Sequence, residues 1–341
     1  GTGMGGFEEM AYLFVIALTV LLSWALTGLA TWYASRVELL DHPGDRHSHQ
    51  HATPRGGGAG LVVALMSATA LLMPTSIPAW WPSCVAPGLV ILAVTGWWDD
   101  HRSLSVRLRF FVQLAVTLYL LLCTASYDRI GGVIPMAFAG LFIIWMTNLY
   151  NFMDGSNGMA GLQGVFAGSV LAGLFWQAGD GQSALLGLLT AAACAGFLPW
   201  NLGRARVFMG DVGSLALGFA FAAMLVHGVG SGAFTLPVGL LVMLLFLADA
   251  TLTLLARVIK GERWYNAHRQ HLYQRLIAHG WSHGRVALFY QGINLTLVLP
   301  GVWVAVLYPA LAWPVTASLV LIFSVGWYVL TRKTGVLAQA G

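Results

Sequence analysis

Long apolar runs recur along almost the whole chain and restrict what it can fold into. Most of them are about 17 to 25 residues long, the length at which a helix crosses the ~30 Å hydrocarbon layer of a membrane. Hydrophobic residues make up 58% of the 341 positions and charged residues 9%, which leaves little material for a soluble surface. We therefore predict an all-α, polytopic membrane bundle of about eleven helices. The expected spans are 10–34, 57–74, 84–98, 108–125, 132–150, 160–177, 182–199, 212–230, 234–256, 285–308 and 311–331.

The distribution of Lys and Arg predicts the orientation of this bundle, because both residues accumulate in cytoplasmic loops. The C-terminal tail and the loops 35–56, 99–109, 200–211 and 257–284 fall on one side, and every Lys and Arg except Arg129 lies in or borders one of these segments. We expect the N-terminus outside, the C-terminus in the cytoplasm, and a single integral-membrane domain over 1–341 whose helical bundle covers 7–331. This bias, together with the binding of an anionic ligand, is enough to explain the formal charge of +4. No nucleic acid partner is therefore expected.

The three cysteines show no pattern of a disulfide framework or a zinc site. Cys84, Cys123 and Cys194 lie in or beside separate predicted spans and lack metal-ligand spacing. We expect them to be packing residues.

A polar stretch follows the apolar run that ends near residue 150. If the helix continues, Asn148, Asn151 and Asp154 recur at a spacing of three and form one polar edge. The glycines after Asp154 allow close approach to the backbone. Polar groups at the end of a membrane helix are costly without a function, so we interpret this edge as one wall of a site.

The first predicted cytoplasmic loop is rich in cations, histidines and glycines. Arg46 and Arg55 beside a glycine run favour binding of phosphate or a lipid head group. His47, His49 and His51 alternate in the same loop, but without a fixed scaffold they are a weak signal for a metal. An ordinary positively charged loop is the remaining interpretation.

Two adjacent carboxylates, Asp99 and Asp100, stand at the start of the next cytoplasmic loop. They repel one another, so we expect a compensating cation between or near them. Arg102 is one candidate, and Mg²⁺ is the other, because this ion prefers carboxylate oxygens and substrate phosphates. Solvation of a helix end explains the pair equally well.

Asp211 lies between two glycines at the start of another apolar run. A helix N-terminal cap explains it, because Asp accepts from unpaired helix amides. The second interpretation is a functional site. It is favoured because Asp99, Asp100, Asp154 and Asp211 are all predicted on the cytoplasmic side, although they come from three separate loops.

The longest loop, 257–284, contains an apolar stripe at helical spacing. Leu272, Tyr273, Leu276 and Ile277 form the stripe, and Gly280 can end the helix. We expect an interfacial helix along the membrane surface. Asp249, within the ninth span, either pairs with a cation or relays protons.

Taken in order, these residues resemble the polyprenyl-phosphate N-acetylhexosamine-1-phosphate transferases, in particular the O-antigen-initiating branch. The motifs cover about residues 35 to 280: Asp41…Arg46…His49…Thr53-Pro54-Arg55-Gly56-Gly57, Gly96…Asp99-Asp100, Asn148…Asn151…Asp154-Gly155, Asn201…Phe208-Met209-Gly210-Asp211…Gly213-Ser214-Leu215 and His271. The resemblance implies a helix bundle in the bacterial inner membrane with a cytoplasmic active site. It also implies transfer of a sugar 1-phosphate from a UDP-N-acetylsugar to undecaprenyl phosphate, with release of UMP.

The resemblance further implies roles for the matching residues. Asp211 and Asp100 would bind Mg²⁺, with Mn²⁺ as an alternative metal, and Asp99, Asp154 and His271 would complete a catalytic set. The residues expected to bind substrate are Arg46, His49, Arg55, Arg102, Asn148, Asn151, Asn201 and Phe208, with Phe208 stacked on uracil. Membrane lipids are further partners, and a homodimer is left open.

Phosphate chemistry favours direct attack by the lipid phosphate over a covalent aspartyl intermediate. A phosphate monoester has a second pKa near ~6, so it is mostly dianionic at neutral pH and needs little help from a base. Catalysis is then mainly alignment and charge neutralisation.

One departure from the family pattern affects the sugar. A His-x-His-His cluster is usual in the last loop, whereas here His271 is followed by Tyr273 and Gln274. N-acetylglucosamine and an N-acetylated 6-deoxyhexose such as N-acetylfucosamine both remain candidates. Two rival functions are a lipid-diphosphate hydrolase and a transporter, although a transporter should bind its substrate near mid-membrane, often between repeated halves.

Overall fold

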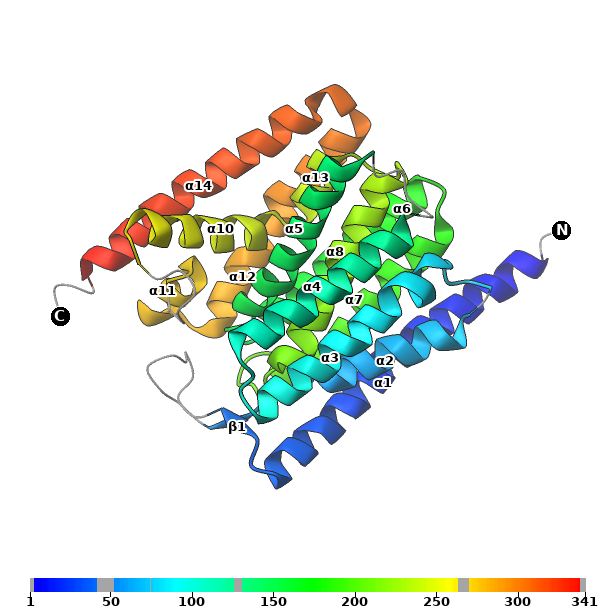
Figure 1. Cartoon of the computed structure of the whole chain (residues 1–341), viewed down its shortest axis with the longest axis horizontal. Helices are drawn as coiled ribbons and strands as arrows, with labels where there is room; N and C mark the ends of the chain where they lie inside the picture. Colours follow the sequence, from blue (N-terminus) through cyan, green and yellow to red (C-terminus); the bar gives the residue numbers. More distant parts are fainter. Residues whose placement is uncertain (1–2, 42–51, 74, 126–130, 263–269, 338–341) are drawn as a thin grey trace.

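The computed structural model describes residues 3–41, 52–73, 75–125, 131–262 and 270–337, and it confirms an all-α membrane bundle (Figure 1). The helices are α1 (Gly3–Arg36), α2 (Gly58–Leu71), η1 (Trp81–Val85), α3 (Ala86–His101), α4 (Val106–Thr124), α5 (Val133–Phe152), α6 (Met159–Gln177), α7 (Gly181–Asn201), α8 (Gly210–Gly230), α9 (Leu236–Val242), α10 (Leu244–Ile259), α11 (Leu272–Ala278), α12 (His283–Ile293), η2 (Asn294–Val298), α13 (Leu299–Leu307), η3 (Pro309–Leu311) and α14 (Ala312–Leu337). Strands β1 (Leu40–Asp41) and β2 (Thr53–Pro54) pair antiparallel.

Each predicted span has a helical counterpart, but not all of them are long straight helices. Within the described ranges, nine helices are long and apolar enough to cross a membrane, or ten if the bent pair α9–α10 counts as one span. That pair bends by 84°, at Met243, whose backbone is not helical. The remaining predicted span is the 14-residue α2. The protein is therefore a multi-pass membrane protein, with one broken span and one short apolar helix that the run lengths did not reveal.

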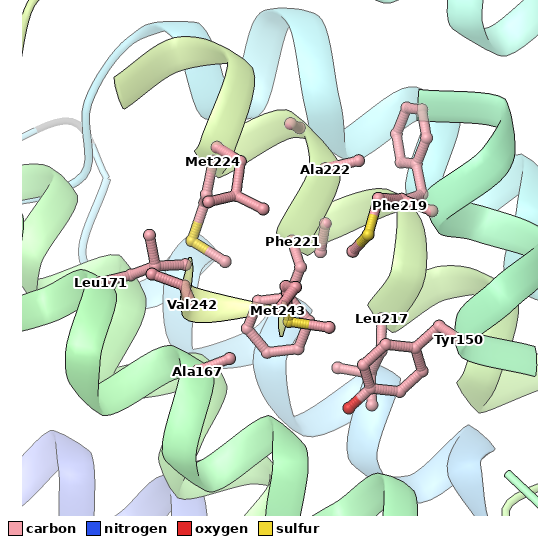
Figure 2. Packing of buried hydrophobic residues seen from close by; sticks show 14 of the residues in the cluster. Tyr150, Ala167, Leu171, Leu217, Phe219, Phe221, Ala222, Met224, Val242 and Met243 are labelled. Atoms are coloured by element: carbon pink, nitrogen blue, oxygen red, sulfur yellow. The ribbon is translucent and has the colours of Figure 1, made fainter. Parts of the chain in front are cut away.

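Helix α8 forms the centre of the bundle and is buried over most of its length. Small residues let its neighbours approach closely: a Cβ added at Gly218 would lie 2.8 Å from the backbone oxygen of Met146 in α5. Figure 2 shows Phe221 of α8 among Met243, Tyr150 and other apolar side chains. Because α8 is fixed on all sides, its N-terminal residues occupy a defined position.

Two of the three cysteines form a disulfide, so the prediction that all three are only packing residues is wrong. Cys84 in η1 is bonded to Cys123 in α4, and Cys194 is a buried free thiol. The 39-residue separation hid the pair, because only the antiparallel arrangement of α3 and α4 brings the two residues together. At 1.5 Å per residue, each cysteine lies roughly 20 Å along its helix from the end that carries Asp99 or Arg109.

We predict that the disulfide stabilises the packing of α3 on α4. Replacing Cys84 by Ala should lower the free energy of unfolding by about 2 kcal/mol, because the cross-link no longer restricts the unfolded chain. Thermal unfolding in detergent, with and without reductant, measures the effect. The control Cys194→Ala should stay as sensitive to reductant as the wild type. An identical melting temperature for oxidised and reduced wild-type protein would contradict the prediction.

Candidate active site

The Asp100 carboxylate joins the end of α3 to the beginning of α8. Its two oxygens accept hydrogen bonds from the backbone N–H groups of Asp211 (3.1 Å) and Val212 (3.2 Å), and its side chain is buried. These N–H groups belong to the first turn of α8, where helix amides have no partner within the helix and the helix dipole favours a negative charge. Asp100 therefore positions Asp211, although the two residues are 111 positions apart.

Asp99 is paired with Arg109 of α4, which the sequence interpretation missed. The Arg109 guanidinium lies 2.9 Å from Asp99 and 3.8 Å from Asp211, so one cation faces two carboxylates. The Leu104 amide also donates to Asp99, at 2.6 Å. The prediction that Arg102 compensates the Asp99–Asp100 pair is wrong: its backbone leaves the helix in an extended conformation and its side chain is exposed.

Asp211 is also held from α5. The Asn151 amide donates to Asp211 at 2.9 Å and to Ser214 of α8 at 2.8 Å. The Asp211 side chain is 26% exposed, so a ligand can reach it. The sequence placed Asn151 beside Asp154 on one helix edge, whereas its side chain connects α5 to Asp211 and Ser214 of α8.

Asp154 lies just beyond α5, since the helix ends at Phe152. Burial raises the pKa of its carboxyl well above the ordinary range, and the negative charges of Asp211 and Asp100 raise it further. Such charge effects act over short distances, so the carboxylates of Asp211 and Asp100 lie near that of Asp154. Side chains from α3, α8 and the segment after α5 therefore share one acidic region.

Gly96 allows α3 to approach α8 closely enough for these contacts. A Cβ added there would lie 2.4 Å from the backbone of Asp211, closer than carbon atoms can pack. Asp100 is one helical turn further along α3, so the distance between the two helices decides whether its carboxylate reaches the amides of α8.

We predict that Gly96→Ala lowers turnover by roughly a hundredfold, because α3 must move away from α8 and misplace Asp100 and Asp211. The control is Gly173→Ala in α6, where an added Cβ meets nothing within 4 Å. Activity of the two purified variants, measured beside their melting temperatures, tests the prediction. Equal activity of Gly96→Ala and Gly173→Ala would show that the close approach is not needed.

The residues that follow β2 bring Arg55 to Phe208, beside the same region. The Arg55 side chain donates to the backbone oxygen of Asp100, and Arg55 pairs with Phe208 in a parallel bridge. The Phe208 amide donates to Pro54 (2.8 Å), and its carbonyl accepts from Gly57 (3.0 Å). Two predicted substrate-binding residues thus lie beside the carboxylates, whereas Arg46 and His49 fall outside the described residues.

The remaining predicted amides make contacts within the protein. Asn148 and Gln113 of α4 exchange two hydrogen bonds, at 2.7 and 3.1 Å. Asn201 is buried, accepts from the Gly158 amide at 2.7 Å and donates to Val207 at 3.0 Å. Its contacts hold the segment between α7 and α8 against the start of α6, so they position the site rather than line it.

Helix α11 places His271 near the end of α5. The His271 ring stacks on Tyr273 (5.9 Å between centroids) and on Phe152 (6.3 Å), and the Tyr273 hydroxyl donates to the Phe152 carbonyl at 2.8 Å. Burial lowers the pKa of His271, and nearby Arg257 and Arg275 add to this while Asp249 opposes it. Burial therefore favours the neutral form of the His271 ring.

The apolar side of α11 packs on the protein, and its position along the membrane surface stays a prediction. Leu272, Tyr273 and Leu276 are buried, and α11 contacts α12 and α14. Asp249 of α10 accepts from the Leu272 amide (2.9 Å), the Tyr290 hydroxyl (2.7 Å) and Trp327 Nε1 (3.0 Å). Asp249 therefore anchors α11 to the bundle, a role that neither of its earlier interpretations included.

The carboxylates fit a Mg²⁺ ion only when a substrate supplies further ligands. Among the described residues, no group of three or more His, Cys, Asp or Glu side chains is arranged to hold a metal by itself. Mg²⁺ in enzymes usually takes one or two carboxylates and completes its shell with water and substrate phosphates. Asp211 and Asp154 are suited to this, since both are partly exposed. The contacts of Asp100 favour holding α8 over direct metal binding.

Comparisons with known proteins identify a family for the chain. Residues 83–229 match the model of glycosyl transferase family 4. A phospho-N-acetylmuramoyl-pentapeptide-transferase of Synechococcus sp. is 32% identical over 333 residues, which are 84% of this chain and 88% of the relative. A probable undecaprenyl-phosphate N-acetylglucosaminyl 1-phosphate transferase of Bacillus subtilis is 25% identical over 340 residues, 95% and 92% of the two chains. A decaprenyl-phosphate N-acetylglucosaminephosphotransferase of Mycobacterium tuberculosis is 28% identical over 327 residues, 83% and 80% of the two chains.

Fold and site define the class: a multi-pass membrane protein whose aspartates gather where α3 ends, α5 ends and α8 begins. The chain belongs to glycosyl transferase family 4, the polyprenyl-phosphate hexosamine-1-phosphate transferases. The family resemblance of the sequence is thus confirmed. The relatives include both pentapeptide and N-acetylglucosamine enzymes, so the O-antigen branch stays a prediction.

Proposed function

We propose that the protein transfers an N-acetylhexosamine 1-phosphate from a UDP-sugar to undecaprenyl phosphate and releases UMP. The observation that carries the proposal is the gathering of Asp100, Asp154 and Asp211, from three segments distant in sequence, at one end of the bundle. Phosphoryl transfer requires a metal cation beside the diphosphate. A cluster of carboxylates is suited to holding that cation. The names of the Bacillus and Mycobacterium relatives support a polyprenyl-phosphate acceptor and transfer of an N-acetylglucosamine 1-phosphate group.

In this proposal the side chains position the reactants. Asp211 and Asp154 would hold Mg²⁺ or Mn²⁺, which when bound supplies charge neutralisation to the diphosphate. Arg109 lies within 3.8 Å of Asp211 and brings a second positive charge to the leaving phosphate. Phe208, beside Arg55, is the candidate to stack on uracil. The lipid phosphate attacks directly, since its dianion needs no strong base.

We further propose that the active site faces the cytoplasm of a bacterial inner membrane and that the product initiates O-antigen or another cell-envelope polysaccharide. The disulfide supports this orientation. Cys84 and Cys123 lie at the helix ends opposite to Asp99 and Arg109, and disulfides persist in oxidising compartments outside the cytosol. N-acetylglucosamine is the first sugar to test, because the Bacillus and Mycobacterium relatives are named for it.

Purified protein with labelled UDP-sugars, undecaprenyl phosphate and Mg²⁺ tests the proposal. Formation of UMP together with a lipid-linked sugar, both dependent on the added lipid, is the expected result. Release of sugar phosphate or inorganic phosphate without the lipid would instead show a hydrolase. Uptake into vesicles without UMP would show a transporter. A panel of UDP-N-acetylsugars then identifies the preferred donor.

A further inference from the structure

One face of α3 carries a hollow that the proposed reaction does not use. Its lining residues recur at helical spacing, and its volume is about 270 Å³; they are Val94, Trp97, Trp98, His101 and Arg102. Asp100, by contrast, is on the side of α3 that contacts α8. The hollow therefore belongs to a different surface of the helix from the acidic site.

The inner wall of the hollow is preformed. The Trp97 ring stacks on Tyr33 of α1, with 5.4 Å between centroids, and lies 4.4 Å from the His101 ring. His101 is held at both nitrogens, since Nδ1 contacts the Trp97 carbonyl at 2.8 Å and Nε2 contacts the Tyr33 hydroxyl at 3.3 Å. These contacts fix two aromatic rings without a ligand, so little ordering is needed on binding.

The outer wall faces the hydrocarbon region of the membrane. Val94 is 56% exposed and Trp98 58% exposed, although both are apolar and lie within the membrane-spanning helix Trp81–His101. Tryptophan near the end of a span is typical of the membrane–water boundary. A molecule that fills the hollow consequently contacts acyl chains on one side and head groups on the other.

Arg102 supplies a positive charge at this boundary. It directly follows α3, its side chain is exposed, and within the described ranges it makes no ion pair or side-chain hydrogen bond. Asp99 and Asp100 do not neutralise it, because Asp99 is paired with Arg109 and Asp100 accepts from α8. Arg36, one turn beyond Tyr33 on α1, adds a second exposed cation.

We propose that this hollow binds an anionic phospholipid of the surrounding leaflet. The Arg102 guanidinium, which matches two phosphate oxygens at once, contacts the head-group phosphate. The acyl chain lies along Val94 and Trp98. A soluble phosphate ester would contact only Arg102 and leave the apolar wall uncovered. A membrane lipid contacts both Arg102 and the apolar wall, so it is the occupant that we propose.

Native mass spectrometry of the full chain tests the proposal, with phosphatidylglycerol and phosphatidylcholine of the same acyl chains as probes. Wild-type protein should retain phosphatidylglycerol preferentially, and Arg102→Gln should lower its retention about fivefold, since one Arg near a membrane surface contributes about that factor. The matched control is Arg107→Gln, the same change of charge at an exposed residue outside the hollow. Trp98→Ala keeps the charge but removes the apolar wall, and retention should also fall.

Four outcomes would overturn the lipid site. Three of them are equal retention of the two lipids by wild-type protein, equal losses in Arg102→Gln and Arg107→Gln, and displacement of phosphatidylglycerol by inorganic phosphate alone. Displacement from the Arg102-dependent site by low undecaprenyl phosphate would assign the hollow to the carrier lipid and would equally contradict the proposal. Melting temperatures of the variants confirm that exposed positions were changed without unfolding. Because lipid retention is read without UDP-sugar, its failure is independent of the transferase assay.

Discussion

Replacing Asp211 by Asn is expected to lower turnover by at least about a thousandfold, because the change removes a charge where the diphosphate must be neutralised. The fold should survive. The Asp211 amide still donates to Asp100, and an Asn side chain still accepts from Asn151 through its carbonyl oxygen. Release of UMP, measured over a range of Mg²⁺ concentrations, gives both the rate and the metal dependence.

The control for this prediction is Asp180→Asn, the same chemical change at the N-terminal cap of α7. Asp180 accepts from the Ser183 amide at 3.0 Å, and Asn serves nearly as well at such a position. Its activity should therefore remain close to that of the wild type. If Asp211→Asn retained normal turnover at saturating Mg²⁺, Asp211 would have to be removed from the metal site and the proposed role of the acidic region revised.

Replacing Asp249 by Ala is expected to be the most destabilising single change. Four donors lose their acceptor in a fully buried position: the Leu272 amide, the hydroxyls of Tyr290 and Thr253, and Trp327 Nε1. Burying such groups without partners costs about 3–5 kcal/mol in total. The melting temperature in detergent should fall by roughly 10 °C. Turnover should fall too, because α11 no longer holds His271 near Phe152.

Tyr290→Phe is the matched control, since it removes one donor to Asp249 and keeps the ring. We expect a loss of about 1 kcal/mol. Asp249→Asn should lie between the two, as one acceptor oxygen remains. A melting temperature for Asp249→Ala within two degrees or so of the wild type would show that α11 is anchored by its apolar contacts instead.

The helices and the acidic residues of the site could be predicted from sequence, because both depend on local patterns. The length of an apolar run shows directly whether it can cross a membrane. A carboxylate at the end of such a run is equally easy to recognise in the sequence. The bend at Met243 and the shortness of α2 were not predictable in this way. Run length reports hydrophobicity but not where a helix breaks, and residues on both sides of Met243 are equally apolar.

Partners of the site residues could not be predicted, because contacts depend on the path of the chain between elements. Arg102 is close to Asp99 in sequence, yet the extended backbone after α3 directs it elsewhere. Arg109 reaches Asp99 only because α4 folds back along α3, and the same arrangement joins Cys84 to Cys123. The stripe on α11 was visible in the sequence, but the hydrogen bond from the Leu272 amide to Asp249, which holds this helix on the bundle, was not.

The Cys84–Cys123 bond has a consequence for biogenesis. With the active site facing the cytoplasm, as proposed, both thiols meet oxidants outside the cytosol, whereas glutathione and thioredoxin would keep them reduced in a chain inserted in the opposite direction. Alkylation of intact cells with a thiol reagent, followed by reduction and electrophoresis, distinguishes molecules with free thiols from molecules with the disulfide. The measurement therefore shows in which direction each molecule was inserted into the bilayer.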